Sequence, residues 1–420
     1  MKVFKFGGAS VKSAEAVRNV AEILSLYKDE KIMVVISAMA KTTNALEKLL
    51  KVFSENSSQK TVIFNEIKQF HFSILKELIT DKDGDAYTNL NIYFDELEGI
   101  INSEIKAKES EYYAKIVGFG EIFSTYIVYS YLKEYSFSCD WKKATDYIIT
   151  DENIGEANVN WEISTKKISK ELKSCFNNYD IVVSQGFISE SENGNATTLG
   201  REGSDYSAAI FAYGLDAEGI TIWKDVPGLL NADPKYFENT QKIDTISYKE
   251  TIELAYYGAS IIHPKTIQPL QNKKIPLYIK SFINPTTEGT AIQFKTYSDS
   301  LIPSYIFKKE QVLISISASD FSFIAEHNLS HIFQLISKFG LKTNMMQNSA
   351  ISFSIIMDNK GQAMLDFIAE LQKEFKVRYN EHLELITIRH YNQHIINDLI
   401  GSRKVYLEQK NRTTVQLLVK

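Results

Sequence analysis

The sequence predicts an α/β protein with a mainly parallel sheet sandwiched by helices, followed by a smaller α+β region. Short apolar runs typical of buried strands alternate with helix-like stretches in roughly the first two thirds of the chain. Beyond a linker expected at 284–304, the order changes to βαββαβ. The 420 residues, 44% of them hydrophobic and 24% charged, suffice for two or three domains.

The first part of the chain begins with a βαβ pattern. We expect a buried strand at 3–6 that ends at two glycines, a helix at 14–27 and a second buried strand at 31–37. The stretch 43–132 is mostly helical in pattern. Further strands are expected at 181–184, 220–223 and 276–280, with helices at 164–175, 204–213 and 248–257. This alternation indicates a parallel sheet covered by helices.

The second part, after the linker, has the pattern of a small domain. The expected elements are strand 311–317, helix 329–339, strands 342–346 and 351–357, helix 362–375 and strand 383–389. The remaining stretch has one short helix pattern and two strands, which is too little for a second unit of this kind.

Composition excludes several classes of function. Forty-seven Lys and Arg oppose 52 Asp and Glu, without a basic block, so we expect no nucleic-acid partner. No apolar run approaches the roughly 20 residues that cross a bilayer, and the start lacks a signal-peptide pattern. Cys139 and Cys175 have no CxxC spacing, which is typical of a reducing compartment, and we expect the cytoplasm. No His/Cys/Asp cluster has structural-zinc spacing, and no metal ligand is assigned to the protein.

Two glycine-containing stretches could bind anions. Lys5 ends the first strand directly before Gly7 and Gly8, where backbone N–H groups and a cation can approach a phosphate; a tight turn with a solvated lysine is the alternative. The stretch GREGSD, 200–205, offers a cation, exposed N–H groups and a helix start, but an ordinary capped turn would look similar. No Walker pattern is present.

Two further stretches carry charge at positions where strands end or helices begin. Glu121 can lie in the first turn of a helix, where the dipole favours its charge. The segment 222–235 follows a strand and could bring Asp225 and lysines to a nucleotide, although a surface turn would look the same.

Taken in order, seven segments resemble one family, the aspartokinases of the amino acid kinase superfamily. They are KFGGAS (5–10), ISAMAKTTN (36–44), GFGEIFS (118–124), SQGFI (184–188), TTLGREGSDYSAA (197–209), KDVPGLLNADP (224–234) and GASIIHP (258–264). The resemblance implies the amino acid kinase fold and phosphorylation of the side-chain carboxylate of L-aspartate by ATP with Mg²⁺. The product would be 4-phospho-L-aspartate, in the first step of lysine, threonine and methionine synthesis. The alternatives are an acetylglutamate or glutamate type of kinase, or a non-catalytic effector-binding relative.

The resemblance also implies roles for individual residues. Lys5 and Asp205 would be catalytic, Lys5 holding the transferring phosphate and Asp205 orienting Lys5. The substrate-binding residues would be Ser37, Thr43, Glu121, Arg201 and Ser204, with Arg201 on the α-carboxylate and Glu121 on the α-ammonium. The nucleotide-binding residues would be Lys5, Gly7, Gly8, Lys224, Asp225, Leu230, Lys235, Ser260 and Ile261.

Several positions depart from the family pattern, among them Lys224 in place of a threonine and Lys235 in place of an arginine. Leu230 stands where an aromatic residue is common, and Ser260 stands where a lysine is common, so we expect Lys224 to replace that cation. Glu202 stands where glycine is common. Because a carboxylate would repel an anionic substrate, we expect Glu202 to face outward with an ordinary negative φ.

The resemblance extends to regulation. It implies a catalytic domain at 1–296, a regulatory ACT domain at 305–390 and an incomplete second ACT-like unit at 391–420, which a strand near 305 could complete. Asn344 and Ser349 would bind an amino-acid effector, which we expect to be lysine. A homodimer or higher oligomer formed through the ACT domains is expected.

Overall fold

The computed structural model describes residues 1–259, 262–296, 298–318, 320 and 323–420, which form two compact units. Unit 1 consists of Met1–Leu229, Lys242–Ile252 and Ile261–Tyr297, and unit 2 of Leu230–Gln241, Glu253–Ser260 and Ser298–Lys420. A linear reading of the sequence does not anticipate that two early segments belong to unit 2. One of them is held there by the Asn231 carbonyl, which accepts from the Tyr305 N–H at 2.7 Å, and by stacking of Phe237 on Tyr305.

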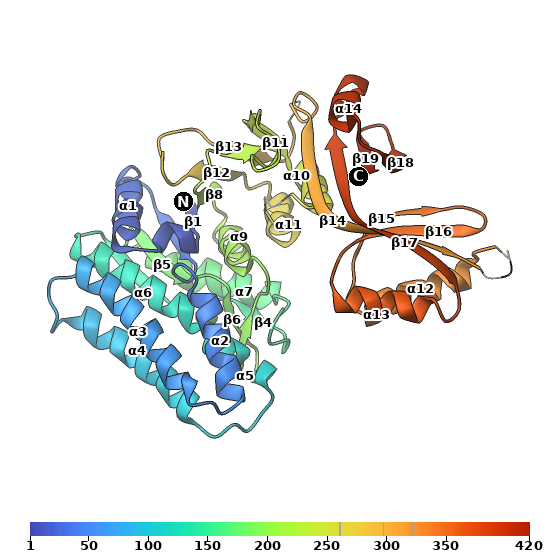
Figure 1. Ribbon diagram of the computed structural model, residues 1–420. Coiled ribbons are helices and arrows are strands. Elements are labelled where there is room, and N and C mark those ends of the chain that lie inside the picture. Colours follow the sequence, from blue (N-terminus) through green and yellow to red (C-terminus); the bar gives the residue numbers. More distant parts are fainter. Residues whose placement is uncertain (260–261, 297, 319, 321–322) are drawn as a thin grey trace. The chain divides into compact units, whose positions relative to one another are not determined.

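Unit 1 is built on a sheet whose described strands follow the order β11-β13-β12-β8-β1-β2-β5-β3 (Figure 1). Their bounds are β1 Lys2–Phe6, β2 Ile32–Ile36, β3 Cys139–Lys142, β5 Ile181–Gln185, β8 Gly219–Lys224, β11 Thr245–Ser247, β12 Leu277–Ser281 and β13 Thr290–Gln293. The six strands from β12 to β3 run parallel, and β13 pairs antiparallel with β12. The expected linker at 284–304 is therefore wrong at 290–293, where alternately buried Thr290 and Ile292 are too few to mark a strand by pattern.

Helices cover both faces of this sheet, and the side-chain alternation of β1 tells the faces apart. Phe4 and Phe6 join the apolar cluster formed with α1, α3, α4 and α6, whereas Lys5 points to the opposite face. Helix α9 packs on this opposite face of β1 (Figure 1). The helices of unit 1 are α1 Ala14–Ser25, α2 Thr42–Ser54, α3 Gln59–Leu78, α4 Asp85–Asn102, α5 Glu109–Val117, α6 Phe119–Glu134, α7 Trp161–Lys167, α8 Lys173–Cys175, α9 Gly203–Leu215, α11 Pro264–Lys273 and the first half of α10 Tyr248–Tyr257. The smaller elements are η1 Gly8–Val11, η2 Ala144–Asp146, the π-helical η3 Ile168–Leu172, and strands β4 Ile149–Thr150, β6 Ile188–Ser191, β7 Ala196–Thr198, β9 Leu229–Leu230 and β10 Lys242–Ile243. The α/β fold class is confirmed.

Unit 2 contains a sheet with the described order β15-β16-β14-β17-β19-β18. Its elements are β14 Ser304–Ser317, α12 Glu326–Lys338, β15 Thr343–Asn348, β16 Ser352–Asp358, α13 Gln362–Leu371, β17 Lys376–Arg389, α14 Gln393–Ile400, β18 Val405–Lys410 and β19 Thr414–Val419. The long strands β14 and β17 pair antiparallel with a register shift next to Glu310, whose φ is +53°. The C-terminal half of β14 pairs with β16, and the C-terminal half of β17 pairs with β19. Both long strands therefore belong to both halves of the sheet. The expected strands 311–317 and 383–389 are thus halves of longer strands.

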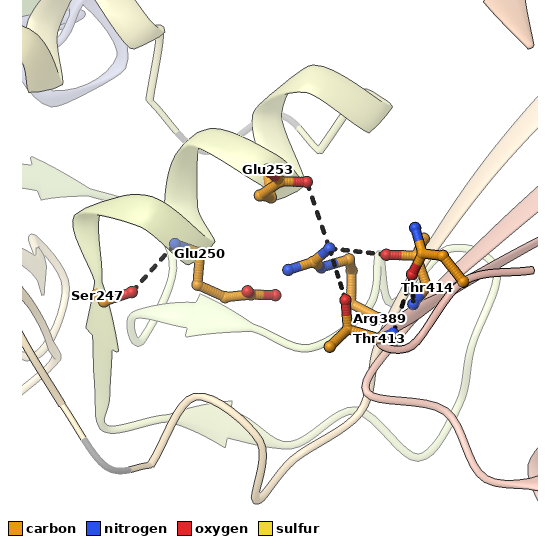
Figure 2. Close-up of polar contacts among 7 residues, drawn as sticks. Ser247, Glu250, Glu253, Arg389, Thr413 and Thr414 are labelled. Atoms are coloured by element: carbon orange, nitrogen blue, oxygen red, sulfur yellow. Dashed lines mark hydrogen bonds and ion pairs between the residues drawn. The ribbon is translucent and has the colours of Figure 1, made fainter.

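A buried arginine holds the second half of α10 within unit 2 (Figure 2). The Arg389 Nη1 donates to Thr414 Oγ1 at 2.7 Å and lies 3.3 Å from Glu253 Oε2. At the start of the same helix, the Ser247 hydroxyl accepts from the Glu250 N–H at 3.1 Å, which satisfies one of the free N–H groups of the first turn.

In the described part of the chain, no helix has the length and apolar character required to cross a membrane.

Candidate active site

The predicted site residues lie at the carboxyl edge of the parallel sheet. Strand β1 is flanked by β2, to which α1 connects it, and by β8, which arrives much later in the chain. Strand order therefore reverses between β1 and β8, and ligands of open α/β sheets bind beyond the strand ends at such a point.

A cavity of about 1070 Å³ opens at this edge. It brings together seven predicted residues: Lys5, Ser37, Thr43, Glu121, Arg201, Ser204 and Asp205. Sequence reasoning missed the other walls, which are Ser110, Tyr113, the loop Glu152–Glu156 and Phe187. These residues come from separate segments without a recognisable motif, so no local signal could have found them.

Lys5 and Asp205 form a buried ion pair on the cavity wall. The Lys5 Nζ lies 2.6 Å from Asp205 Oδ1, and the two side chains are 11% and 7% exposed. Asp205 lies in the first turn of α9, where the helix dipole favours a negative charge. The pair holds a lysine ammonium in a fixed place at the end of β1, where it can meet an anionic group.

Glu121 is a buried acid with one free oxygen. It lies in the first turn of α6, and its Oε1 accepts from the Ala38 N–H at 3.2 Å. Its Oε2 is buried and has no hydrogen-bond partner among the described residues. Burial raises the Glu121 pKa to about 8, although the N–H bond and the charge of Lys5 act in the opposite direction. An incoming cation could supply the missing partner.

The glycine turn after β1 packs against the segment that follows β2. A Cβ on Gly8 would lie 2.5 Å from the Ala38 carbonyl oxygen and 3.1 Å from that of Ala40, so glycine is required by close approach. The Ala40 N–H donates to the Gly8 carbonyl at 3.0 Å. A Cβ on Gly7 would meet only Lys5 Nζ, at an ordinary 3.5 Å. The turn is therefore open at Gly7 and closed at Gly8.

The turn before α9 contradicts the prediction made for Glu202. Its φ is +55° and its ψ is 25°, so a negative φ was wrong. The left-handed conformation at this position explains why glycine is common there in the family pattern. The side chain is exposed, and its Oε2 accepts from the His263 N–H at 2.9 Å. Arg201, its neighbour, is exposed and makes no hydrogen bond with any other described residue.

The predicted nucleotide residues are only partly assembled in unit 1. Lys224 ends β8 and Asp225 follows it; because Trp223 is in register with Phe6, both lie beside the Gly7 turn. Leu230 and Lys235 belong to unit 2. Ser260 and Ile261 lie outside the described residues.

The two predicted effector residues lie on and beside β15 in unit 2. The Asn344 amide oxygen accepts from Lys308 Nζ at 2.7 Å, and its amide nitrogen donates to Gln311 Oε1 and Asp358 Oδ1. Ser349 is exposed and its hydroxyl pairs with that of Ser352. Asn344 is thus part of an internal polar network.

The described residues contain no group of three or more His, Cys, Asp or Glu side chains that could hold a metal ion. The cavity instead offers a buried lysine, an arginine, backbone N–H groups and a buried acid. This set suits a small zwitterion that carries additional negative charge.

Comparisons with known proteins agree with this chemistry. The model of the amino acid kinase family matches residues 1–281. Aspartokinase 1 of Arabidopsis thaliana chloroplasts is 29% identical over 85% of this chain, which spans 63% of that relative's length. The lysine-sensitive aspartokinase 3 of Escherichia coli is 27% identical over 92% of this chain and 86% of its own. The solved structure of E. coli aspartokinase III in complex with aspartate and ADP has the same fold, with a TM-score of 0.81, 23% identity, and coverage of 100% of this chain and 96% of that one. The family match covers well over half of the residues, and the chain belongs to the amino acid kinase family.

Proposed function

We propose that this chain is an aspartokinase, which transfers the γ-phosphoryl group of ATP to the side-chain carboxylate of L-aspartate. The observation that carries the proposal is one cavity in which the Glu121 carboxyl group and the Arg201 guanidinium lie beside the Lys5–Asp205 pair. The similarity to curated aspartokinases over 85–92% of the chain supports the same activity. The product is 4-phospho-L-aspartate, formed in the first step of lysine, threonine and methionine synthesis, and we place the reaction in the cytoplasm.

Recognition of aspartate follows from the charges of the cavity. Arg201 presents a planar fork that suits the α-carboxylate, and it has no competing partner among the described residues. Glu121 has a buried, unsatisfied Oε2 that suits the α-ammonium. Ser37, Thr43 and Ser204 line the same cavity and orient the substrate through their hydroxyls.

Phosphoryl transfer needs positioning and charge neutralisation more than proton transfer. The attacking carboxylate is ionised at neutral pH, so no general base is required. One of its oxygens forms a bond to the γ-phosphorus while the bond between that phosphorus and the bridging oxygen breaks, and ADP leaves. Lys5 neutralises charge on the transferring group, and Asp205 holds Lys5 in place. Asp205 is in this scheme a positioning residue.

The nucleotide side rests on fewer residues. The turn is open at Gly7, where only Lys5 Nζ lies near the position of a Cβ, and this opening fits a phosphate cradle of backbone N–H groups. Lys224 and Asp225 lie beside this turn and would meet the phosphates and the ribose, with Lys224 supplying the cation that Ser260 lacks. Leu230, Lys235 and Ile261 complete the proposed set. Mg²⁺, which neutralises the phosphate charge when bound, would be carried by the nucleotide, because no described cluster of side chains suits it.

Regulation by an amino acid is the finer part of the proposal. We assign 1–296 to catalysis, 305–390 to a first ACT domain and 391–420 to a second ACT-like unit that shares β14, and we expect a homodimer or higher oligomer. Lysine is the expected effector, since the E. coli relative is named lysine-sensitive. Its binding at Asn344 would have to compete with Lys308, Gln311 and Asp358, which occupy both ends of the amide.

The test is an assay of ADP release with aspartate, N-acetylglutamate or glutamate as the only acceptor, with hydroxylamine to trap the acyl phosphate. We expect turnover and hydroxamate formation with aspartate alone. Turnover with another acceptor would assign a different amino acid kinase activity, and no turnover with any acceptor would favour a non-catalytic relative. Inhibition by millimolar lysine in the same assay tests the effector; an unchanged rate would contradict lysine regulation.

A further inference from the structure

Glu202 adopts a backbone conformation that any residue with a Cβ adopts at a cost. Its φ of +55° lies in the left-handed region, immediately before α9, where glycine is free of that cost. A residue persists in such a conformation when surrounding contacts determine it. The contacts of Glu202 are therefore expected to stabilise this conformation.

Those contacts join the starts of two helices. The backbone carbonyl of Glu202 accepts from the N–H groups of Asp205, at 3.0 Å, and Tyr206, at 3.2 Å, and so begins α9. Its carboxylate accepts from the N–H of His263, the residue that caps α11. Negative charge is favourable at a helix N-terminus, and a carboxylate makes a strong hydrogen bond to a backbone N–H. One residue thus ties the first turns of α9 and α11 together at the cavity.

The same two helices are tied a second time at their other ends. Asp216, which also has a left-handed φ of +51°, ends α9 and forms an ion pair with Lys273 in the last turn of α11. This second tie therefore lies at the other end of both helices from the wall formed by 200–205, and Asp216 does not line the cavity. At both ends a carboxylate on a residue with a left-handed φ contacts the neighbouring helix. Only the contact of Glu202 borders the cavity.

We propose that Glu202 is a positioning residue that fixes the turn 200–205 to the start of α11 and so holds Arg201 at the mouth of the cavity. This inference rests on the proposed binding of aspartate by Arg201. The hydrogen bond between Glu202 and His263 already restricts the turn 200–205. The turn therefore loses less conformational freedom when the α-carboxylate binds. It also directs the Glu202 charge to a backbone N–H instead of to the anionic substrate.

The experiment compares three variants in steady-state assays with aspartate and ATP. Glu202→Gln keeps an oxygen that can accept from the His263 N–H, so we expect a KM for aspartate within about threefold of wild type. Glu202→Gly keeps the backbone conformation but loses the tie, so we expect the aspartate KM to rise about tenfold with kcat nearly unchanged and Tm unchanged or raised. Asp216→Gly is the matched control at the far end, and we expect it to change Tm without changing the aspartate KM.

The outcomes separate a positioning role from a structural one. An equal aspartate KM in the wild type and Glu202→Gly would overturn the proposal, and so would an equal rise in Glu202→Gly and Asp216→Gly. A fall in KM in both Glu202 variants would show that the carboxylate repels substrate, which also contradicts it. Failure of the wild type to turn over aspartate would instead refute the proposed function, and thermal shift with the three proteins would then show whether the tie exists at all.

Discussion

Titration of Glu121 is expected to control how the use of aspartate depends on pH. Burial raises its pKa to about 8, so at pH 7 only about one ligand-free molecule in eleven carries the carboxylate charge. Because an α-ammonium group binds the ionised form, kcat/KM for aspartate should rise about tenfold for each pH unit below 8 and level off above it. From pH 6 to pH 9 the rise amounts to about ninetyfold.

The assay is the initial rate at low aspartate and saturating ATP between pH 6 and pH 9, where the substrate amine keeps its proton. Glu121→Gln should have a low kcat/KM without this rise, because the amide does not titrate. Calorimetry in buffers of different ionisation enthalpy should record close to one proton released by the wild-type protein when aspartate binds at pH 7. A flat kcat/KM profile from pH 6 to pH 8, or the same rise in Glu121→Gln, would refute the reasoning.

The same shift has a consequence for stability, with a definite sign. The folded-state pKa of Glu121 is raised above the unfolded value, so the folded protein binds the extra proton between pH 4.5 and about 8. The stabilisation is present below pH 4.5 and is lost as the pH rises through 8. The free energy of unfolding of the wild type should therefore fall relative to that of Glu121→Gln by up to about 1.4 kcal/mol per pH unit in this window.

Three further predictions test other parts of the structure. Gly8→Ala places a Cβ 2.5 Å from a carbonyl oxygen and should lower the free energy of unfolding by about 1–3 kcal/mol, whereas Gly7→Ala should leave it nearly unchanged in the same urea titration. Burial lowers the His71 pKa to about 4, so wild-type stability should fall by about 3 kcal/mol from pH 6.5 to pH 4; a slope that persists in His71→Leu would contradict this cause. Lys224→Ala should raise the KM for ATP about tenfold; unchanged ATP affinity and turnover would end its role as replacement cation.

Apolar patterning predicted the frame of unit 1 well, for a physical reason. Strands buried on both faces are continuous apolar runs, and 31–37, 181–184 and 220–223 all have this form and match strands β2, β5 and β8. Strand β13 was missed because only two of its side chains are buried and its neighbours are turn residues. Pattern therefore predicts strands that are buried on both faces better than half-buried strands.

The long strands of unit 2 show a second limit of sequence patterning. β14 changes its packing environment midway, with the polar stretch around Glu310 between two buried halves, and a polar interruption reads as a strand end. The pairing of Glu310 with His382 across the register shift, at 2.9 Å between Oε2 and Nδ1, depends on residues 72 positions apart. No local window contains both partners.

The site was predictable where motifs carry the chemistry and not where conformation does. Lys5, Glu121 and Arg201 were named from their segments and line one cavity. The predicted conformation of Glu202 was wrong. The sequence shows that a glutamate stands where glycine is common, but it does not show the positive φ that favours glycine at this position. The His263 N–H, which donates to the Glu202 carboxylate, lies 61 residues away.

Strand β19 gives the C-terminal sheet an unusual sensitivity to truncation. All six of its residues are buried, and it pairs with β17 on one side and β18 on the other. Deletion of β19 would uncover the C-terminal half of β17, whose other half belongs to the sheet under α12 and α13. The deletion would expose an apolar strand edge that is prone to aggregation. A loss of regulation in a variant with a tag or deletion at this point would then be caused by misfolding.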